Sequence, residues 1–316
     1  MKKRWIALTA ALLAVTMILS GCAPAASSNS SQSVSSGVTA PAPESPSAIP
    51  EQLPETIVSL SPSNTEVLLA LGLASKLVAV DTYSAKLPGV PATLPQFDMM
   101  KPDAEALVAL KADLILTTGM SVANGEDPFQ PVRDAAGSTM VDIATPASLG
   151  EIADSLLLIG KAVGKPAEAQ ALVDSMKQGI DQVAAIGKTI SDKKKVYVEI
   201  SAAPYCYSFG SGVYLNEALE LLGATNVLAD QTGWVSVSEE AVIAANPQVI
   251  LTNVDYIEKP VEEILARTGW ASIDAVKNKQ VFFISTNPST LPNHNVVLAL
   301  REMAKAIYPE AYQALS

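Results

Sequence analysis

The chain repeats one short segment in its two halves. Residues 103–117 read DAEALVALKADLILT, and residues 238–252 read SEEAVIAANPQVILT. The segments align at an offset of 240 − 105 = 135 residues, which pairs Glu105 with Glu240. Each copy has the pattern of a helix followed by a strand. The repeat therefore predicts two similar lobes, each with a carboxylate at an equivalent position, and two similar lobes usually hold something between them.

A second echo lies upstream, where TEVLLALGLASKLVAVD (65–81) resembles NEALELLGATNVLAD (216–230). Short β-branched runs alternate with helical patterns through the body of the chain, which is typical of βα units. A capping box is expected at Ser63–Glu66, ahead of the first helix. The expected strands are 56–60, 76–80, 113–117, 139–143, 194–200, 248–252 and 280–285.

The middle of the chain carries helical patterns without strand signals. Pro166 suits the first turn of the second helix in this stretch. A helix that separates the two echoing halves would act as a stiff link between them. We therefore expect an α/β fold with two Rossmann-like lobes joined by a single long rigid helix. The predicted boundaries are 56–160 for the N-terminal lobe, 161–192 for the linking helix and 193–316 for the C-terminal lobe.

The N-terminus predicts an exported protein. A basic start precedes an apolar run that is too short for a stable membrane span, so residues 1–21 are interpreted as a signal peptide. Leu19-Ser20-Gly21-Cys22 resembles the lipobox of bacterial lipoproteins, which implies lipidation of Cys22; the alternative is an ordinary signal peptide with a chance cysteine. The Ser-, Pro- and Ala-rich residues 22–55 are expected to be a flexible tether. We therefore expect an extracytoplasmic protein that is anchored to the cell membrane by lipid. The length of the tether suits the outer face of a Gram-positive cell.

The charge balance excludes some partners. The chain has 21 Lys and Arg and 32 Asp and Glu, and removal of Lys2, Lys3 and Arg4 with the signal leaves 18 − 32 = −14. This acidity argues against nucleic acid binding, which needs clustered cations. Cys206 is the remaining cysteine once Cys22 is lipidated, so no intrachain disulfide is possible.

Loops that follow strands are the expected ligand-binding positions, because ligands of open α/β sheets lie beyond the carboxyl ends of the strands. Aromatic residues are only 5% of the chain, yet they gather in these loops. Flat rings and methionines suit a bulky, largely apolar chelate or macrocycle, although packing within a lobe is the alternative for each. The candidate ligand-binding residues are Tyr83, Phe97, Met99, Met100, Met120, Tyr205, Tyr207, Trp234, Asn287 and His294.

Four segments together resemble the substrate-binding proteins of cobalamin and iron-siderophore ABC transporters. They are TIVSLSPSNTEVLLALGLASKLVAVD, DAEALVALKADLIL, GWVSVSEEAVIAANPQVIL and GWASIDAVKNKQVFFIS, and the resemblance covers roughly residues 56–311. It implies a class III periplasmic-binding-protein fold, a ligand held between the lobes, no cofactor, and a monomer that delivers its ligand to a permease and its ATPase.

The resemblance also implies roles for single residues. Glu105 and Glu240 match the surface glutamates, one on each lobe, that contact permease arginines. Tyr83, Tyr207 and Trp234 match aromatic residues of the cobalamin site. Asp103 and Ser238 are the expected N-caps of the two helices, and each glutamate lies two residues further along the chain. The alternative for the two glutamates is therefore that acids in a first helical turn are favoured by the helix dipole without any partner.

The chain departs from the cobalamin-binding pattern in its second half. Asn287 and Leu291 stand where the cobalamin site has a charged pair. The loops that carry the candidate ligand-binding residues contain no arginine, whereas catecholate siderophore binders commonly use cationic clefts. A neutral or cationic ferric siderophore is therefore expected first, with another corrinoid or haem as alternatives. His294 is the single histidine, so it either contacts the metal or packs at a helix start, and a bare-metal site with several histidines is not expected.

Other classes of protein were weighed against this interpretation. Ser121 follows a strand and His294 could serve as its base, which would make a surface hydrolase. The Gly119-Met120-Ser121-Val122-Ala123 segment lacks the second glycine of a nucleophile elbow, and no acid is placed to orient the histidine. A surface scaffold is a third possibility, but it would not need aromatic residues at strand ends. We therefore expect a binding protein and not an enzyme.

Overall fold

A computed structural model describes residues 52–122, 125–135 and 137–315. The predicted signal peptide (1–21), Cys22 and most of the tether lie outside the described residues. Within the described part, no helix is both long enough and apolar enough to cross a membrane.

The N-terminal lobe is a five-stranded parallel sheet in the order β3-β2-β1-β4-β5. Its strands are β1 (Ile57–Ser59), β2 (Leu77–Asp81), β3 (Gln96–Phe97), β4 (Leu114–Thr118) and β5 (Thr139–Ile143). Its helices are α1 (Pro62–Ala70), α2 (Ala104–Ala109) and α3 (Gln130–Asp134).

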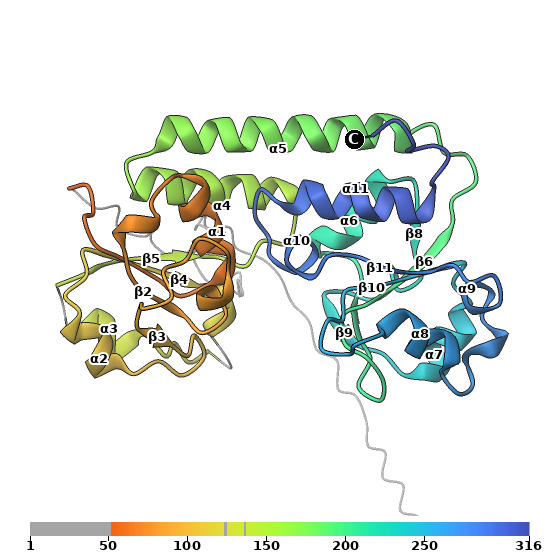
Figure 1. The fold of residues 1–316 in the computed structure, drawn as a ribbon, viewed down its shortest axis with the longest axis horizontal. Helices are drawn as coiled ribbons and strands as arrows, with labels where there is room; N and C mark the ends of the chain where they lie inside the picture. The colour runs from red at the N-terminus through yellow and green to blue at the C-terminus, as the bar shows by residue number, and fades with distance from the viewer. Residues whose placement is uncertain (1–51, 123–124, 136, 316) are drawn as a thin grey trace, which may run out of the picture. The chain divides into compact units, whose positions relative to one another are not determined.

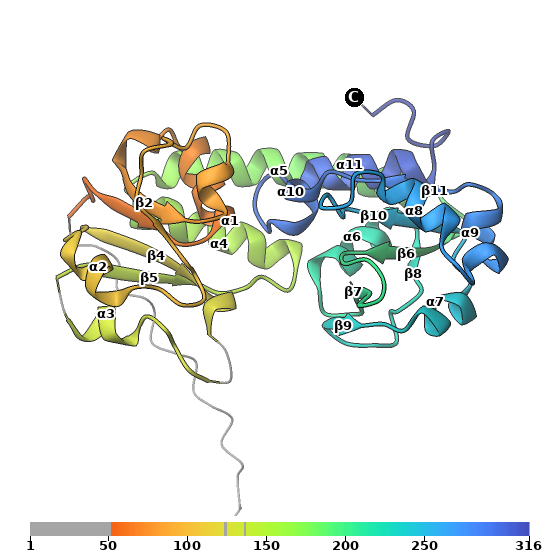
Figure 2. The same ribbon diagram turned by 60° about the horizontal axis from the view of Figure 1, so that its bottom comes forward.

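Two consecutive helices lie between the halves of the chain, and the second of them is the single long helix that was expected, since it runs along both lobes in Figure 1. They are α4 (Leu149–Ala162) and α5 (Pro166–Gly187), and α5 lies inside the segment that was predicted as the link. They lie side by side in both views (Figure 1, Figure 2), and Pro166 begins α5 as expected. Their approach is close, because a Cβ on Gly160 would lie 2.2 Å from the Cβ of Ala169. Only glycine fits this crossing without a shift of one helix.

The C-terminal lobe contains a four-stranded parallel sheet in the order β11-β10-β6-β8 and a separate antiparallel pair, β7 with β9. The strands are β6 (Lys195–Glu199), β7 (Tyr207–Phe209), β8 (Thr225–Asn226), β9 (Trp234–Ser236), β10 (Val249–Thr252) and β11 (Val281–Phe283). The helices are α6 (Tyr214–Leu221), α7 (Glu239–Ala245), α8 (Pro260–Ala266), α9 (Asp274–Lys277), α10 (Thr286–Thr290) and α11 (Val296–Ile307).

The two sheets share one topology. Strands β2-β1-β4-β5 of the first sheet correspond in order to β8-β6-β10-β11 of the second. In both lobes the echoed segment forms a helix and then the strand beside the central one, α2 with β4 and α7 with β10. The internal echo in the sequence is therefore an echo of structure, and the α/β fold with two Rossmann-like lobes is confirmed.

Alternation along the strands divides the interior into three cores. In β4, Leu114 and Leu116 face the core that contains α1 and α4, whereas Ile115 faces a second core with α2 and α3. In β10, Ile250 faces a third core with α7 and α8. The first core continues through α4, α5, α6 and α11 into the second lobe, so the lobes share one packed interior. A continuous core resists large changes of angle, since packed interiors are not freely deformable.

The expected capping box at the start of α1 is wrong. The N-cap is Ser61, which makes no side-chain capping hydrogen bond, and Pro62 occupies the first turn. The Ser63 hydroxyl instead donates to the carbonyl of Pro292 at 2.8 Å, and Glu66 accepts from side-chain amides of the second lobe. Ser63 and Glu66 therefore form hydrogen bonds with the second lobe and do not cap their own helix.

Candidate functional site

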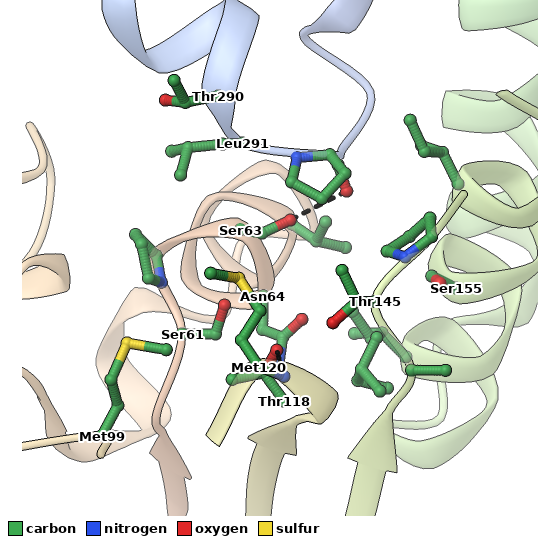
Figure 3. Close-up of a pocket in the computed structure, with 18 of the residues that line it drawn as sticks. Ser61, Ser63, Asn64, Met99, Thr118, Met120, Thr145, Ser155, Thr290 and Leu291 are labelled. Carbon is green, nitrogen blue, oxygen red and sulfur yellow. Dashed lines mark hydrogen bonds between the residues drawn. The ribbon is translucent and has the colours of Figure 1, made fainter. Parts of the chain in front are cut away.

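A pocket of about 330 Å³ lies at the carboxyl ends of β1, β2, β4 and β5 (Figure 3). This is where ligands of open parallel sheets bind. The wall is completed by α4 and by residues 290–292 of the second lobe. The lining residues are Ser61, Pro62, Ser63, Asn64, Val67, Tyr83, Met99, Met100, Thr118, Met120, Ile143, Ala144, Thr145, Pro146, Ile152, Ser155, Leu156, Ile159, Thr290, Leu291 and Pro292.

The lining contains no charged side chain, and most of its surface is aliphatic, thioether or aromatic. Several of its polar groups are already hydrogen-bonded to other groups of the protein. The Asn64 amide donates to the carbonyl of Thr117 at 3.0 Å, the Ser63 hydroxyl is bonded to Pro292, and the Thr118 hydroxyl accepts from the Met120 amide at 3.3 Å. The pocket is therefore built to surround apolar matter and to orient it with a few neutral polar groups.

A buried polar network supports the Tyr83 side of the pocket. The Asp81 carboxylate is fully buried at the end of β2 and accepts from the backbone amides of Tyr83 and Ser84, at 2.9 and 3.0 Å. The Ser84 hydroxyl also donates to Asp81 and lies 2.8 Å from the Thr65 hydroxyl. Satisfied buried polar groups of this kind rigidify a turn. Tyr83, which is exposed, is thus presented on a fixed backbone.

Four of the ten candidate ligand-binding residues line the pocket: Tyr83, Met99, Met100 and Met120. Phe97 does not, which corrects its expected place at the ligand. It belongs to β3, pairs with Asp81 and packs with Val58 and Leu107 in the core, because the parallel pairing turns its ring inward. Asn287 is exposed on α10 and is not part of the pocket.

The second lobe presents the other aromatic candidates as a cluster. The rings of Tyr207 and Trp234 are stacked, with centroids 6.4 Å apart and planes 5° apart, and Phe209 meets Trp234 edge-on. Tyr207 and Trp234 are each more than a third exposed, so β7 and β9 display a flat aromatic face. Tyr205 is 84% exposed, and the Tyr256 hydroxyl lies 2.9 Å from the Ala202 amide, which donates to it.

Some lining residues were not expected from the sequence. Ser61 and Thr145 follow β1 and β5, so the strand-end rule could have identified them. Ile152, Ser155 and Ile159 belong to α4, whose apolar stripe indicated only a helix against a core. No signal in the sequence pointed to them as pocket residues.

A polar bridge crosses between the lobes beside the pocket. Asn293 and Asn295 donate their side-chain amides to the same Glu66 oxygen, at 2.8 and 2.9 Å. Together with the bond from Ser63 to Pro292, these contacts hold residues 291–295 of the second lobe against α1. Bonds to a carboxylate are the stronger kind. We call this set the Glu66 bridge, and it places Leu291 and Pro292 in the pocket wall.

His294 lies inside the Glu66 bridge and does not line the pocket. It is half-buried, and its Nδ1 is buried without a hydrogen-bond partner among the described residues. Burial lowers the pKa of His294 below its ordinary value, and the nearby Glu66 carboxylate offsets part of this. His294 is therefore a neutral, packed residue at neutral pH.

The pH dependence of stability follows from that burial. An unfolded chain takes up a proton on His294 near pH 6.5, whereas the folded chain resists it, so the free energy of unfolding falls as the pH drops below about 6.5. His294→Asn removes this contribution. Denaturant titrations of both proteins from pH 7.5 to 5.0 are expected to show the native protein losing stability relative to the variant. Parallel curves would contradict the buried neutral state.

Ser121 and His294 do not form a hydrolytic pair. The Ser121 hydroxyl is buried and has no hydrogen-bond partner among the described residues, and His294 Nδ1 has none either. A serine nucleophile needs a base within hydrogen-bond reach. Across residues 52–122, 125–135 and 137–315, no group of three or more His, Cys, Asp or Glu side chains is arranged to hold a metal ion.

A buried charge cluster lies at the carboxyl end of β6. Arg267 donates to both Glu199 oxygens, at 2.6 and 3.1 Å, and also to Glu263. Burial raises the pKa of Glu199 although Arg267 opposes this, and burial raises the pKa of Cys206 to about 11. Cys206 therefore stays a thiol at neutral pH and is not a reactive nucleophile.

Glu105 and Glu240 occupy equivalent exposed positions. Each is the second residue of its helix, after an N-cap whose side chain accepts from a backbone amide: Asp103 from Ala106 and Ser238 from Ala241. Both N-caps were predicted and are confirmed. Among the described residues, neither glutamate side chain forms a hydrogen bond or an ion pair, so no contact within its own lobe accounts for a carboxylate at this position.

The fold and the strand-end pocket together define a solute-binding protein of class III architecture. The periplasmic binding protein family matches residues 57–288, and the chain belongs to this family. It is 34% identical, over 99% of this chain and 100% of the relative, to the ABC transporter substrate-binding lipoprotein YvrC of Bacillus subtilis. The chain is thus a substrate-binding protein of an ABC importer.

Two further similarities concern proteins with stated ligands. A cobalamin-binding protein of Halobacterium salinarum is 26% identical over 96% of this chain and 85% of the relative. The crystal structure of a possible iron-binding periplasmic solute-binding protein from Staphylococcus epidermidis matches with a TM-score of 0.70 and 29% identity, over 81% of this chain and all of that one.

Proposed function

We propose that this protein captures a bulky metal chelate, in the first place a ferric siderophore, between its lobes and delivers it to an ABC importer. The observation that carries the proposal is the uncharged pocket at the strand ends, edged by Tyr83 and three methionines. The exposed Tyr207–Trp234 face of the second lobe supplies a second flat surface for an apolar ligand. The possible iron-binding relative supports this choice of ligand.

The charge of the site selects among chelates. A charged ligand buried against uncharged walls loses hydration without gaining a partner, which costs several kcal/mol. The uncharged walls therefore favour a neutral ferric siderophore, and the net negative charge of the chain disfavours an anionic catecholate complex more than a cationic siderophore. A corrinoid is the second candidate, because the Halobacterium relative binds cobalamin, and haem is the third.

The proposal includes a location and a partner. Lipidation of Cys22 and the tether of residues 22–55 would hold the two lobes (56–160 and 193–316, linked through 161–192) on the outer face of the cell membrane. The lipoprotein relative supports this placement. Glu105 and Glu240 would then contact the permease, one from each lobe, while the ATPase drives transport. The shared core predicts only a small change of lobe angle on loading.

Ligand binding by the detergent-solubilised full-length protein tests the proposal. The probes are a neutral and a cationic ferric hydroxamate, an anionic ferric tris-catecholate, cyanocobalamin and haem, read by tryptophan fluorescence and native mass spectrometry. We expect a hydroxamate to bind at least about tenfold more tightly than the catecholate, about 1.4 kcal/mol or more. The fluorescence change should vanish in Trp234→Phe while binding persists by mass. Binding of none of the five probes would refute the chelate assignment.

A further inference from the structure

The pocket is too small for the ligand that the proposed function assigns to the protein. An apolar protein cavity of about 150 Å³ accepts one benzene molecule. A volume of 330 Å³ therefore accommodates a group about twice that size, near the lower end of roughly 300–1,000 Å³ for ligand sites. A whole ferric siderophore or corrinoid is larger than this, so only one part of such a ligand can enter.

The deep walls of the pocket show which part. Ile152, Leu156 and Ile159 come from successive turns of α4, and Ile143 and Val67 complete an aliphatic surface. The polar groups near them are largely committed to the protein, as with Ser63, whose bond to Pro292 is visible in Figure 3. Lys86 lies 5.7 Å from the Tyr83 ring centre but is not part of the lining. A charge placed here would be desolvated without a partner, which is costly.

The Glu66 bridge makes the pocket a feature of both lobes. Thr290, Leu291 and Pro292 form its C-terminal wall, and the bonds from Asn293, Asn295 and Ser63 fix that wall against α1. These bonds join residues 227 to 229 positions apart in the chain. The space is therefore defined by tertiary contacts that can be satisfied without a ligand, which is the condition for a preformed site.

We infer that this pocket is a subsite for one uncharged, largely apolar substituent of the transported solute, of about the size of one or two rings or a short acyl arm. The inference rests on the proposed function and deepens it, because it assigns the chelated metal to the space outside this pocket. The pocket then selects among chelates by the arm they carry and not by the metal.

Three aromatic probes of similar size and different charge test the subsite: toluene, benzoate and benzylammonium. The readout is the methyl resonances of methionine in the full-length protein, with Met99, Met100 and Met120 in the pocket. Met176 and Met303 are buried in the shared core and serve as internal controls. Toluene is expected to shift the three pocket methyls and not the controls. Both charged probes should bind at least about tenfold more weakly, a difference of about 1.4 kcal/mol.

Two variants of α4 locate the binding. Ser155→Phe places a ring in the pocket wall and should abolish the toluene shifts, whereas Asp154→Phe, on the exposed neighbour, should leave them unchanged. If Ser155→Phe fails to fold, the comparison of the three probes on the native protein still decides. Equal or tighter binding of benzoate or benzylammonium, or no shift with toluene, would overturn the subsite. The proposed function is tested separately by the binding of the five chelates, whatever the outcome with the three aromatic probes.

Discussion

Charge reversal of Glu105 and Glu240 together, as Glu105→Lys with Glu240→Lys, is expected to abolish solute uptake and to leave solute affinity unchanged. Both glutamates are exposed, lie at equivalent positions of α2 and α7, and are outside the pocket lining. In the proposed docking, the two lysines would face arginines of the permease, and like charges placed together at an interface cost several kcal/mol. Uptake should therefore fall by about 100-fold or more at low solute concentration. The measurement is transport of labelled solute in cells or proteoliposomes, paired with binding to the purified protein.

A matched control separates docking from charge itself. Glu262 is also an exposed acid in the first turn of a helix, α8, so Glu262→Lys loses the same favourable interaction with a helix dipole. Uptake by that variant should remain near the native level. Each single reversal should give an intermediate loss. Preserved uptake in the double variant, or a collapse of affinity, would show that the two glutamates only stabilise their helices.

Replacement of Arg267 by leucine is expected to lower the free energy of unfolding by about 3–5 kcal/mol, because it leaves a buried carboxylate without its partner. The side chains of Arg267 and Glu199 are 5% and 1% exposed, and Arg267 also stacks on Trp270 at 4.2 Å. Burial alone would lower the pKa of Arg267, but its bonds to Glu199 and Glu263 outweigh this and raise it. The loss is a large part of a typical total of about 5–15 kcal/mol.

The double variant Glu199→Leu with Arg267→Leu should recover part of that stability in denaturant titrations, since both buried charges are then gone. The exposed pair Lys277–Asp274, at 3.5 Å, provides the control: Lys277→Leu should cost no more than about 1 kcal/mol. If Arg267→Leu costs as little as Lys277→Leu, the buried cluster does not stabilise the lobe.

The secondary structure was largely predictable because it depends on local pattern. The strands read from β-branched runs appear within one or two residues of their expected ends, as β4 (Leu114–Thr118) shows against 113–117. Asp103 and Ser238 were recognised as N-caps because a capping side chain bonds only a few residues ahead. The same reasoning predicted a capping box at the start of α1, and that prediction was wrong because Glu66 bonds to residues more than 220 positions away.

The pocket was predictable only in part. The strand-end rule identified Tyr83 and Met120, because position after a strand is a property of chain order. The rule misplaced Phe97, whose ring turns into the core when β3 pairs with β2. Leu291 was indicated only by the resemblance, as a position of the cobalamin site. The α4 residues were not predictable, because nothing local distinguishes an apolar residue that faces a core from one that faces a cavity.

The sequence by itself determined that this chain folds as two matching α/β lobes and carries one equivalent glutamate on each. Periodicity, capping signals and the segment repeated at an offset of 135 residues are local properties of the sequence, and they can be recognised without knowledge of distant contacts. The tertiary structure alone decided that the pocket is uncharged, that it is small, and that the second lobe closes it through Glu66 and Asn293. Those properties depend on which side chains meet across the fold, and packing and hydrogen bonding between distant residues settle that.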